Sequence, residues 1–231
     1  MASHGQPEPE AEFPLPGLQA RTPEERYGLA LEKAREALRR QDPQIKAWQS
    51  GADYYPDETG GGGYWVLRFW GEDYRITYPE GEVRHAATGE VPPIAEQILM
   101  LHYLATADGN PMASQWVAFR ELPGGLAYDS AYQGRTAHRL TAAFGQDVAG
   151  FVRAARALGG ERLAFGDASF LFRVFPRLWM AVVLYAADEE FGASASVLFD
   201  GAADHYLPTE DLAVLGGLVV SRLIRAARSK E

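Results

Sequence analysis

The segment before the last predicted helix contains acidic and imidazole side chains, which can take part in acid–base chemistry or bind a metal ion. Asp200, Asp204 and His205 lie close together there. A carboxylate beside an imidazole can move a proton, and both groups can bind a metal ion. We expect His205 to bind a cofactor and Asp200 to be a metal ligand. The alternative is structural, because Thr209 followed by acidic residues is typical of a helix N-cap.

A second group of carboxylates follows a strongly apolar run. Asp188, Glu189 and Glu190 stand together in one predicted turn. Carboxylate oxygens are the ligands that hard divalent cations prefer, so Asp188 and Glu190 join Asp200 as metal-binding candidates. The alternative is a solvated hairpin tip, since adjacent strand residues point to opposite faces and do not converge readily on one ion.

Two further candidates come from the middle of the chain. Arg120 and Glu121 end a predicted strand, just before Leu-Pro-Gly-Gly, where a charged pair can face a ligand. His102 lies within an apolar helical segment, either as a cofactor ligand or as a hydrogen-bonded core residue.

Aromatic residues are concentrated in one predicted hairpin, which includes Trp65 and Trp70. Some of them must face the core. The others, if exposed, would suit a flat aromatic ligand or a partner protein, so both tryptophans are cofactor-binding candidates. Dense packing under the first helix is the alternative.

Familiar catalytic patterns are missing from the sequence. Neither Gly-x-Ser-x-Gly nor His-Glu-x-x-His occurs, and the glycine run at 60–63 is not followed by Lys-Ser or Lys-Thr. The chain has no cysteine, which excludes disulfides, thiolate zinc sites and cysteine-ligated iron–sulfur clusters within it.

The composition favours a globular protein. Of 231 residues, 47% are apolar and 23% are charged, which suits one domain with a substantial core. A net charge of −9 argues against binding to nucleic acid or to an anionic membrane. No apolar run reaches the roughly 20 residues of a membrane helix. With no signal peptide and no cysteine, we expect a cytoplasmic location.

Hydrophobic periodicity and turn residues predict the elements that must position these side chains. Residues 1–21, rich in Pro, Glu and Gly, are expected to be a disordered tail. Helices are predicted over 22–40, 43–50, 91–107, 129–145, 146–158 and 208–228, and strands over 64–70, 74–78, 82–85, 116–120, 162–165, 170–175, 178–185 and 193–199. Because the strands come in runs, we predict an α+β fold, with residues 22–231 forming a single domain whose mainly antiparallel sheet packs against several helices.

Four separated strings resemble one family in order. They are PPIAEQILMLHYL at 92–104, WVAFRELPGG at 116–125, DEEFGASASVLFD at 188–200 and YLPTEDLAVLGGLVVSRLI at 206–224. Over residues 25–226 the chain is similar to the bacterial and archaeal family called domain of unknown function 3786. Relatives occur alone or fused to a four-cysteine iron–sulfur module like that of corrinoid iron–sulfur proteins. The resemblance therefore implies a role near a corrinoid or another tetrapyrrole such as haem, and an iron–sulfur or corrinoid protein as a partner. His205 or His102, candidates by their positions in the sequence, would then be the ligand of the cofactor metal. This chain lacks the cysteines of the fused module.

These observations together favour a non-catalytic protein that binds a small molecule or cofactor between sheet and helices. A hydrolase or lyase that uses carboxylates such as Glu121, Asp188 and Asp200, with or without a metal ion, is the first alternative. A protein-interaction module is the second.

Overall fold

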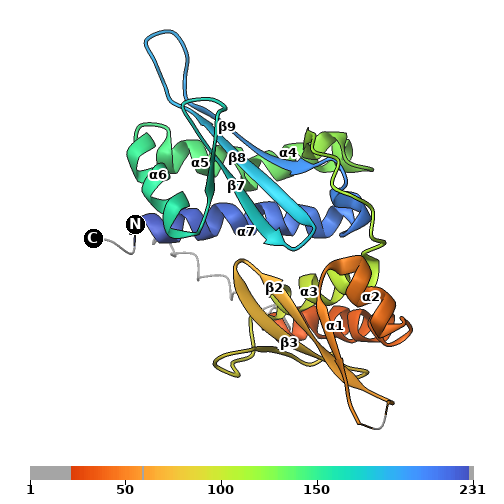
Figure 1. Cartoon of the computed structure of the whole chain (residues 1–231). Helices are drawn as coiled ribbons and strands as arrows, with labels where there is room; N and C mark the ends of the chain where they lie inside the picture. The colour runs from red at the N-terminus through yellow and green to blue at the C-terminus, as the bar shows by residue number, and fades with distance from the viewer. Residues whose placement is uncertain (1–21, 59, 229–231) are drawn as a thin grey trace, which may run out of the picture.

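The structure is a computed structural model that describes residues 22–58 and 60–228. The expected disordered tail, residues 1–21, lies outside the described residues. The described chain contains seven α-helices and two antiparallel sheets, which confirms the α+β class. The prediction of one sheet was wrong, because each sheet belongs to a lobe of its own (Figure 1).

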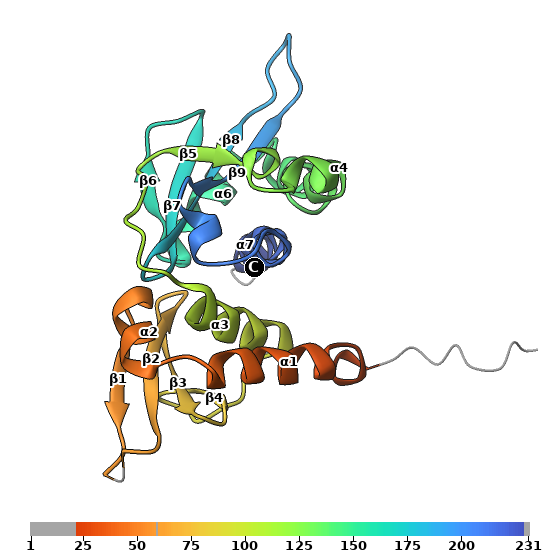
Figure 2. The same ribbon diagram turned by 90° about the vertical axis from the view of Figure 1, so that its right-hand side faces the viewer.

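The N-terminal lobe, residues 22–106, contains a four-stranded sheet and three helices. The strand order is β1-β2-β3-β4, and α1 and α3 lie along one side of this sheet (Figure 2). Trp65, Leu67 and Phe69 alternate along β2 and are fully buried, as the period of a strand requires. The bounds are α1 (Pro23–Arg39), α2 (Pro43–Ser50), β1 (Asp53–Pro56), β2 (Gly63–Phe69), β3 (Glu72–Tyr78), β4 (Val83–His85) and α3 (Ile94–Thr106).

The C-terminal lobe, residues 107–228, contains the five-stranded sheet, in the order β5-β9-β8-β7-β6. Its helices, α7 among them, lie on one side of this sheet (Figure 2). Helix α7 lies between the sheet and the N-terminal lobe. The bounds are β5 (Trp116–Ala118), the 3₁₀ turn η1 (Phe119–Glu121), α4 (Gly125–Arg135), α5 (Ala137–Phe144), α6 (Val148–Ala157), β6 (Glu161–Leu163), β7 (Ala168–Phe175), β8 (Leu178–Tyr185), β9 (Ser194–Asp200), the 3₁₀ turn η2 (Ala203–His205) and α7 (Thr209–Arg228).

The hairpin of the N-terminal lobe turns more tightly than predicted. The sequence suggested a turn over residues 71–73, but β2 and β3 are joined by Trp70 and Gly71 alone. Both residues have positive φ, 54° and 81°, as a type I′ turn requires. Upstream of the glycine run the chain forms a short strand that the sequence did not predict, β1, which pairs with β2.

The single helix predicted over residues 129–145 is two helices. The first begins earlier, at Gly125, because Gly124 adopts a left-handed φ of 73° that turns the chain into the helix. Thr136, with φ −120° and ψ −87°, separates α4 from α5. Its buried hydroxyl donates to the Tyr132 carbonyl at 2.8 Å, so the break is satisfied by a local hydrogen bond.

The last helix, predicted over 208–228, buries one apolar stripe. Leu212, Leu215 and Val219 are fully buried against the shared core, which extends through both lobes. No helix among the described residues is both long and apolar enough to cross a membrane.

Candidate functional site

A pocket of about 310 Å³ lies where the tip of the β2–β3 hairpin meets the C-terminal lobe. Three segments that are distant in sequence line it: the hairpin tip, the α6–β6 connection and β7. We call it the interlobe pocket; its residues are Arg68, Trp70, Gly71, Leu158, Gly159, Glu161, Phe172 and Arg173.

The backbone of Trp70 is held in an unusual conformation at this pocket. Its φ of 54° is uncommon for a bulky residue other than glycine. The Trp70 N–H donates to the Val174 carbonyl at 2.9 Å, at an irregularity in the register of β7. Strained backbone of this kind costs about 1–3 kcal/mol and tends to occur at functional sites.

The Trp70 ring contacts other side chains, but its indole nitrogen has no hydrogen-bond partner in the described structure. The ring packs on Phe172, with centroids 5.8 Å apart, and the Arg222 guanidinium lies 5.2 Å from the ring centroid. The indole Nε1 is buried and has no hydrogen-bond partner in the described structure. A buried unpaired donor costs about 1–3 kcal/mol, which an acceptor atom of a ligand would recover.

Two guanidinium groups, each close to a carboxylate, lie at the pocket, and the Glu161 carboxylate lines it as well. The Arg68 Nε lies 3.2 Å from the Gly71 carbonyl oxygen and 3.5 Å from the Asp73 carboxylate. Arg173 pairs with Glu161 at 2.9 Å. Both arginine side chains are more than half exposed, so they remain accessible to a negatively charged ligand.

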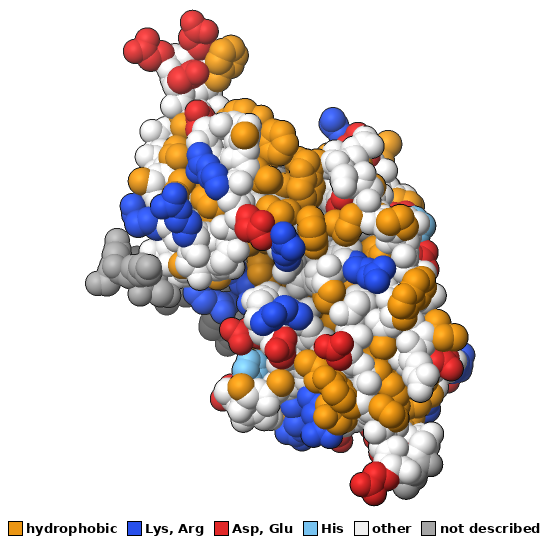
Figure 3. Space-filling model, in the orientation of Figure 1, with side chains coloured by type: hydrophobic (Ala, Val, Ile, Leu, Met, Phe, Trp, Pro, Cys, Tyr) orange, Lys and Arg blue, Asp and Glu red, His pale blue; other side chains and the backbone are white. Residues whose placement is uncertain are grey.

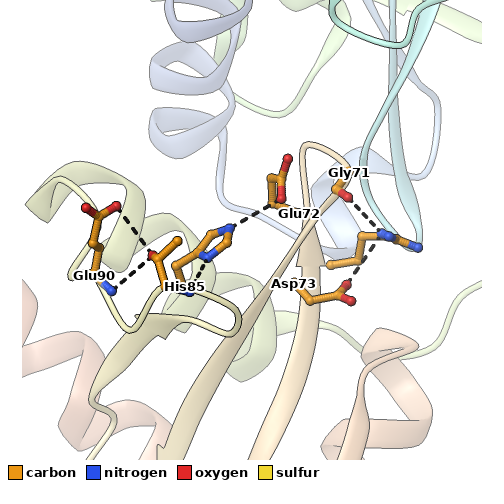
Figure 4. A network of polar contacts seen from close by, with 7 residues as sticks. Gly71, Glu72, Asp73, His85 and Glu90 are labelled. Carbon is orange, nitrogen blue, oxygen red and sulfur yellow. Dashed lines mark hydrogen bonds and ion pairs between the residues drawn. The ribbon is translucent and has the colours of Figure 1, made fainter.

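Polar contacts brace the hairpin tip from both sides (Figure 4). On one side Gly71 and Asp73 face Arg68, and on the other the Glu72 carboxylate lies 3.3 Å from His85 Nε2. The Thr88 N–H donates to His85 Nδ1 at 3.1 Å, which leaves Nε2 as the protonated nitrogen that donates to Glu72. The tip is therefore fixed before any ligand arrives.

Helices α3 and α7 hold the two lobes together beside the pocket. Arg222 donates to Glu96 at 2.8 Å, with 25% and 12% of the side chains exposed. His102 Nδ1 lies 2.6 Å from the Asp211 carboxylate. Charge-assisted hydrogen bonds of this length are stronger than neutral ones and fix the relative orientation of the helices.

The two predicted histidines do not meet, but they share one arrangement. His205 Nδ1 lies 2.6 Å from the Asp108 carboxylate, as His102 does from Asp211. The carboxylate raises the pKa of His205 above its ordinary value. Among the described residues, Nε2 of each imidazole has no protein partner, and a carboxylate on Nδ1 is the usual support of a metal-binding histidine. Neither histidine lines the interlobe pocket.

Only one of the two predicted tryptophans reaches a pocket. Trp70 lines the interlobe pocket, whereas Trp65 is fully buried and donates its indole N–H to the Pro43 carbonyl at 3.0 Å. Arg120 and Glu121 belong to η1, away from this pocket. The Glu121 carboxylate accepts the Ala118 N–H at 2.6 Å, so it closes the 3₁₀ turn.

The predicted metal-binding residues do not converge, and two of them, Asp188 and Asp200, accept hydrogen bonds from backbone N–H groups. Asp188 accepts N–H groups of Glu190 and Phe191 at 2.9 and 2.6 Å, and these bonds lower the pKa of its carboxyl group. Asp188, Glu189 and Glu190 belong to the connection between β8 and β9, and Figure 3 shows acidic side chains at its protruding tip. Nowhere in the described chain do three His, Cys, Asp or Glu side chains come close enough to hold a metal ion.

Asp200 is buried below the loop before β5. Its two oxygens accept the N–H groups of Ala113, Ser114 and Ala202, at 2.8, 2.8 and 3.0 Å. A carboxylate with three backbone donors fixes two loops at the end of β9, which accounts for its burial without a metal ion.

Sequence reasoning missed the groups that surround Trp70. Arg68, Arg173 and Arg222 lie in different elements, and nothing in their spacing indicates that they meet. One local signal was present, because Trp-Gly between two alternating runs of β-forming residues suits a two-residue hairpin turn.

The fold and this site define a two-lobed α+β protein with a pocket of ligand size at the lobe junction. The chain belongs to the family described as "Domain of unknown function (DUF3786)", whose family model matches residues 42–222. This match confirms the resemblance of the four strings. A comparison with curated proteins found no match, and a comparison with solved structures found none either.

Proposed function

We propose that this protein is a cytoplasmic, non-catalytic accessory protein that binds a small molecule in the interlobe pocket. The observation that carries the proposal is Trp70, a pocket-lining residue that combines a strained backbone with a buried, unpaired indole N–H. The absence of cysteine supports a reducing compartment.

The pocket favours a compact ligand. Its volume lies at the lower end of the roughly 300–1,000 Å³ that is common for small-molecule sites. Trp70 and Phe172 offer apolar surface, the indole offers a donor, and Arg68 and Arg173 offer positive charge. A single ring system that carries a carboxylate matches these groups. Because both lobes form the walls, the bound ligand would also strengthen the lobe junction.

A corrinoid or haem is less well supported. His102 and His205 have the carboxylate support that a metal-binding imidazole uses. However, neither lines the interlobe pocket, and that pocket is sized for one ring rather than a macrocycle. The pocket therefore does not fit a tetrapyrrole on either imidazole, and a link to a corrinoid or iron–sulfur protein partner stays a prediction from the family resemblance.

Carboxylate-dependent catalysis has less support than binding. Glu121, Asp188 and Asp200 each accept backbone N–H groups at short distance. A general base must instead direct a lone pair at its substrate. Their contacts favour loop-holding roles.

Binding of benzoate, a planar ring with one carboxylate, tests the proposal. We expect benzoate to raise the melting temperature of the wild-type protein and to shift amide resonances at the hairpin tip and β7. Trp70→Phe keeps an aromatic ring but removes the N–H donor, and should weaken binding about tenfold, equivalent to the ~1.4 kcal/mol of one hydrogen bond.

Trp48→Phe is the matched control, because Trp48 is exposed on α2 and does not line the pocket. Equal weakening by Trp70→Phe and Trp48→Phe, or no binding of benzoate at millimolar concentration, would refute this assignment of the pocket.

A further inference from the structure

A second pocket, of about 370 Å³, lies on the other side of the C-terminal lobe. It is formed by the loop that follows η1, by α4 and by the first turns of α7. Phe119, Pro123, Tyr128 and Val214 supply apolar walls, and Arg135 and Glu210 supply opposite charges. We call it the α4–α7 pocket.

The apolar wall of this pocket is partly fixed and partly open. Phe119 is buried and stacks on Tyr132, with ring centroids 4.1 Å apart, so the floor is rigid. Tyr128 and Val214 are 39% and 45% exposed, and the neighbouring Leu126 is 75% exposed. Large apolar side chains exposed around a hollow indicate a site that excludes water when it is filled.

The two charged residues of the pocket lack ionic partners. Among the described residues, no carboxylate lies within 4.0 Å of the Arg135 guanidinium and no cation within 4.0 Å of the Glu210 carboxylate. Arg135 is instead positioned over the Tyr128 ring, 5.3 Å from its centroid. The two charges therefore face the same pocket without neutralising each other.

Helix ends add to this charge pattern. The pocket lining includes Gly124 and Thr209, at the N-terminal ends of α4 and α7. The positive pole of a helix favours a carboxylate nearby, and Glu210 in the first turn of α7 supplies it. The Thr209 hydroxyl donates to the Pro123 carbonyl at 2.7 Å, which ties the start of α7 to the loop before α4.

We infer that the α4–α7 pocket binds a small zwitterion with an apolar side chain, of the class of the apolar α-amino acids. The ligand carboxylate would pair with Arg135, its ammonium group with Glu210, and its side chain would cover Phe119 and Val214. This arrangement neutralises both free charges and buries the open apolar wall at the same time.

Calorimetric titration of the full chain with L-phenylalanine tests this inference. Phenylacetate, which lacks the ammonium group, and phenethylamine, which lacks the carboxylate, are the comparison ligands. We expect L-phenylalanine to bind more tightly than either. Arg135→Gln should weaken binding of L-phenylalanine at least tenfold, and Glu210→Gln should do so without weakening phenylacetate.

Arg139→Gln is the matched control, since Arg139 is an exposed arginine on α5 that bonds to Ser221 and does not line the pocket. Arg135 and Glu210 are both exposed, so circular dichroism should show all three variants folded. Trp70→Phe should leave this binding unchanged, which separates the α4–α7 pocket from the interlobe pocket. The inference is overturned if L-phenylalanine does not bind at millimolar concentration, or if Arg135→Gln and Arg139→Gln bind it equally.

Discussion

The Trp70 N–H and the Val174 carbonyl, 2.9 Å apart, join the turn of one sheet to the irregular register of β7 in the other. Five-stranded and four-stranded sheets thus meet through a backbone hydrogen bond and not only through side chains. Because a hydrogen bond of this kind needs the left-handed turn at Trp70 and Gly71, the geometry of the hairpin tip should control the lobe junction.

Gly71→Ala should destabilise the protein by about 1 kcal/mol, measured by urea unfolding. An added Cβ meets no atom within 4 Å, so the cost comes from the positive φ of 81° alone. Gly28→Ala is the matched control, because Gly28 also has open space but lies within α1. That substitution should stabilise by about 0.5–1 kcal/mol. Equal effects of the two would contradict the turn geometry.

Glu96→Ala should destabilise the protein by about 1–3 kcal/mol, below the cost of breaking a fully buried ion pair, because Arg222 keeps some contact with water. The substitution leaves the Arg222 guanidinium, which lies beside the Trp70 ring, without its acceptor. The comparison variant is Glu36→Ala, which removes a carboxylate of α1 that pairs with Arg40 at the surface. It should lower the free energy of unfolding by less than ~0.5 kcal/mol. Chemical denaturation of both variants measures the difference, and similar losses would show that the junction pair is no more important than a surface pair.

The Asp108–His205 pair should make stability depend on pH. The hydrogen bond to Asp108 raises the pKa of His205 above 6.5, so its contribution is fully present below 6.5 and is lost as the pH rises through the raised value. Burial alone would raise the pKa of Asp108, but the bond from His205 and backbone N–H groups lower it below 3.8. Its contribution is present above 3.8 and is lost as the pH falls through the lowered value.

The melting-temperature difference between wild type and His205→Gln should therefore be largest between about pH 4 and 6.5. Both side chains are 40–50% exposed, so the stabilisation should stay under about 1 kcal/mol. His138→Gln, at an exposed position on α5, is the control. A difference that grows from pH 6 to pH 8 has the wrong sign for this pair.

Asp200→Ala should destabilise the protein by about 1–3 kcal/mol, because three backbone donors lose their acceptor. Glu189→Ala, in the exposed β8–β9 turn, should have no measurable effect. Thermal unfolding with and without EDTA separates this role from the predicted metal-binding role. A loss of wild-type stability on adding EDTA, absent in Asp200→Ala, would favour the metal ion instead.

Local sequence patterns predicted much of the secondary structure. The stripe Leu212, Leu215, Val219 and Leu223 defines α7, and all four side chains are fully buried. The alternation along β2 likewise defines a strand with one buried face. Patterns of this kind depend on residues a few positions apart. The spacing of apolar residues in the sequence therefore predicts which face of a helix or strand is buried. The family resemblance was also available at this level, because it rests on short strings in order.

Only the tertiary structure decided which chemical groups meet. His102 and Asp211 are 109 residues apart, and Glu96 and Arg222 are 126 apart. His205, Asp200 and the acidic turn at 188–190 lie in separate hydrogen-bonded positions. No local pattern indicated that Arg135 and Glu210 line one pocket. The strand order places distant segments side by side, and it results from burying each sheet against the helices of its own lobe around one shared core. That choice depends on the free energy of the whole core, which no local spacing encodes.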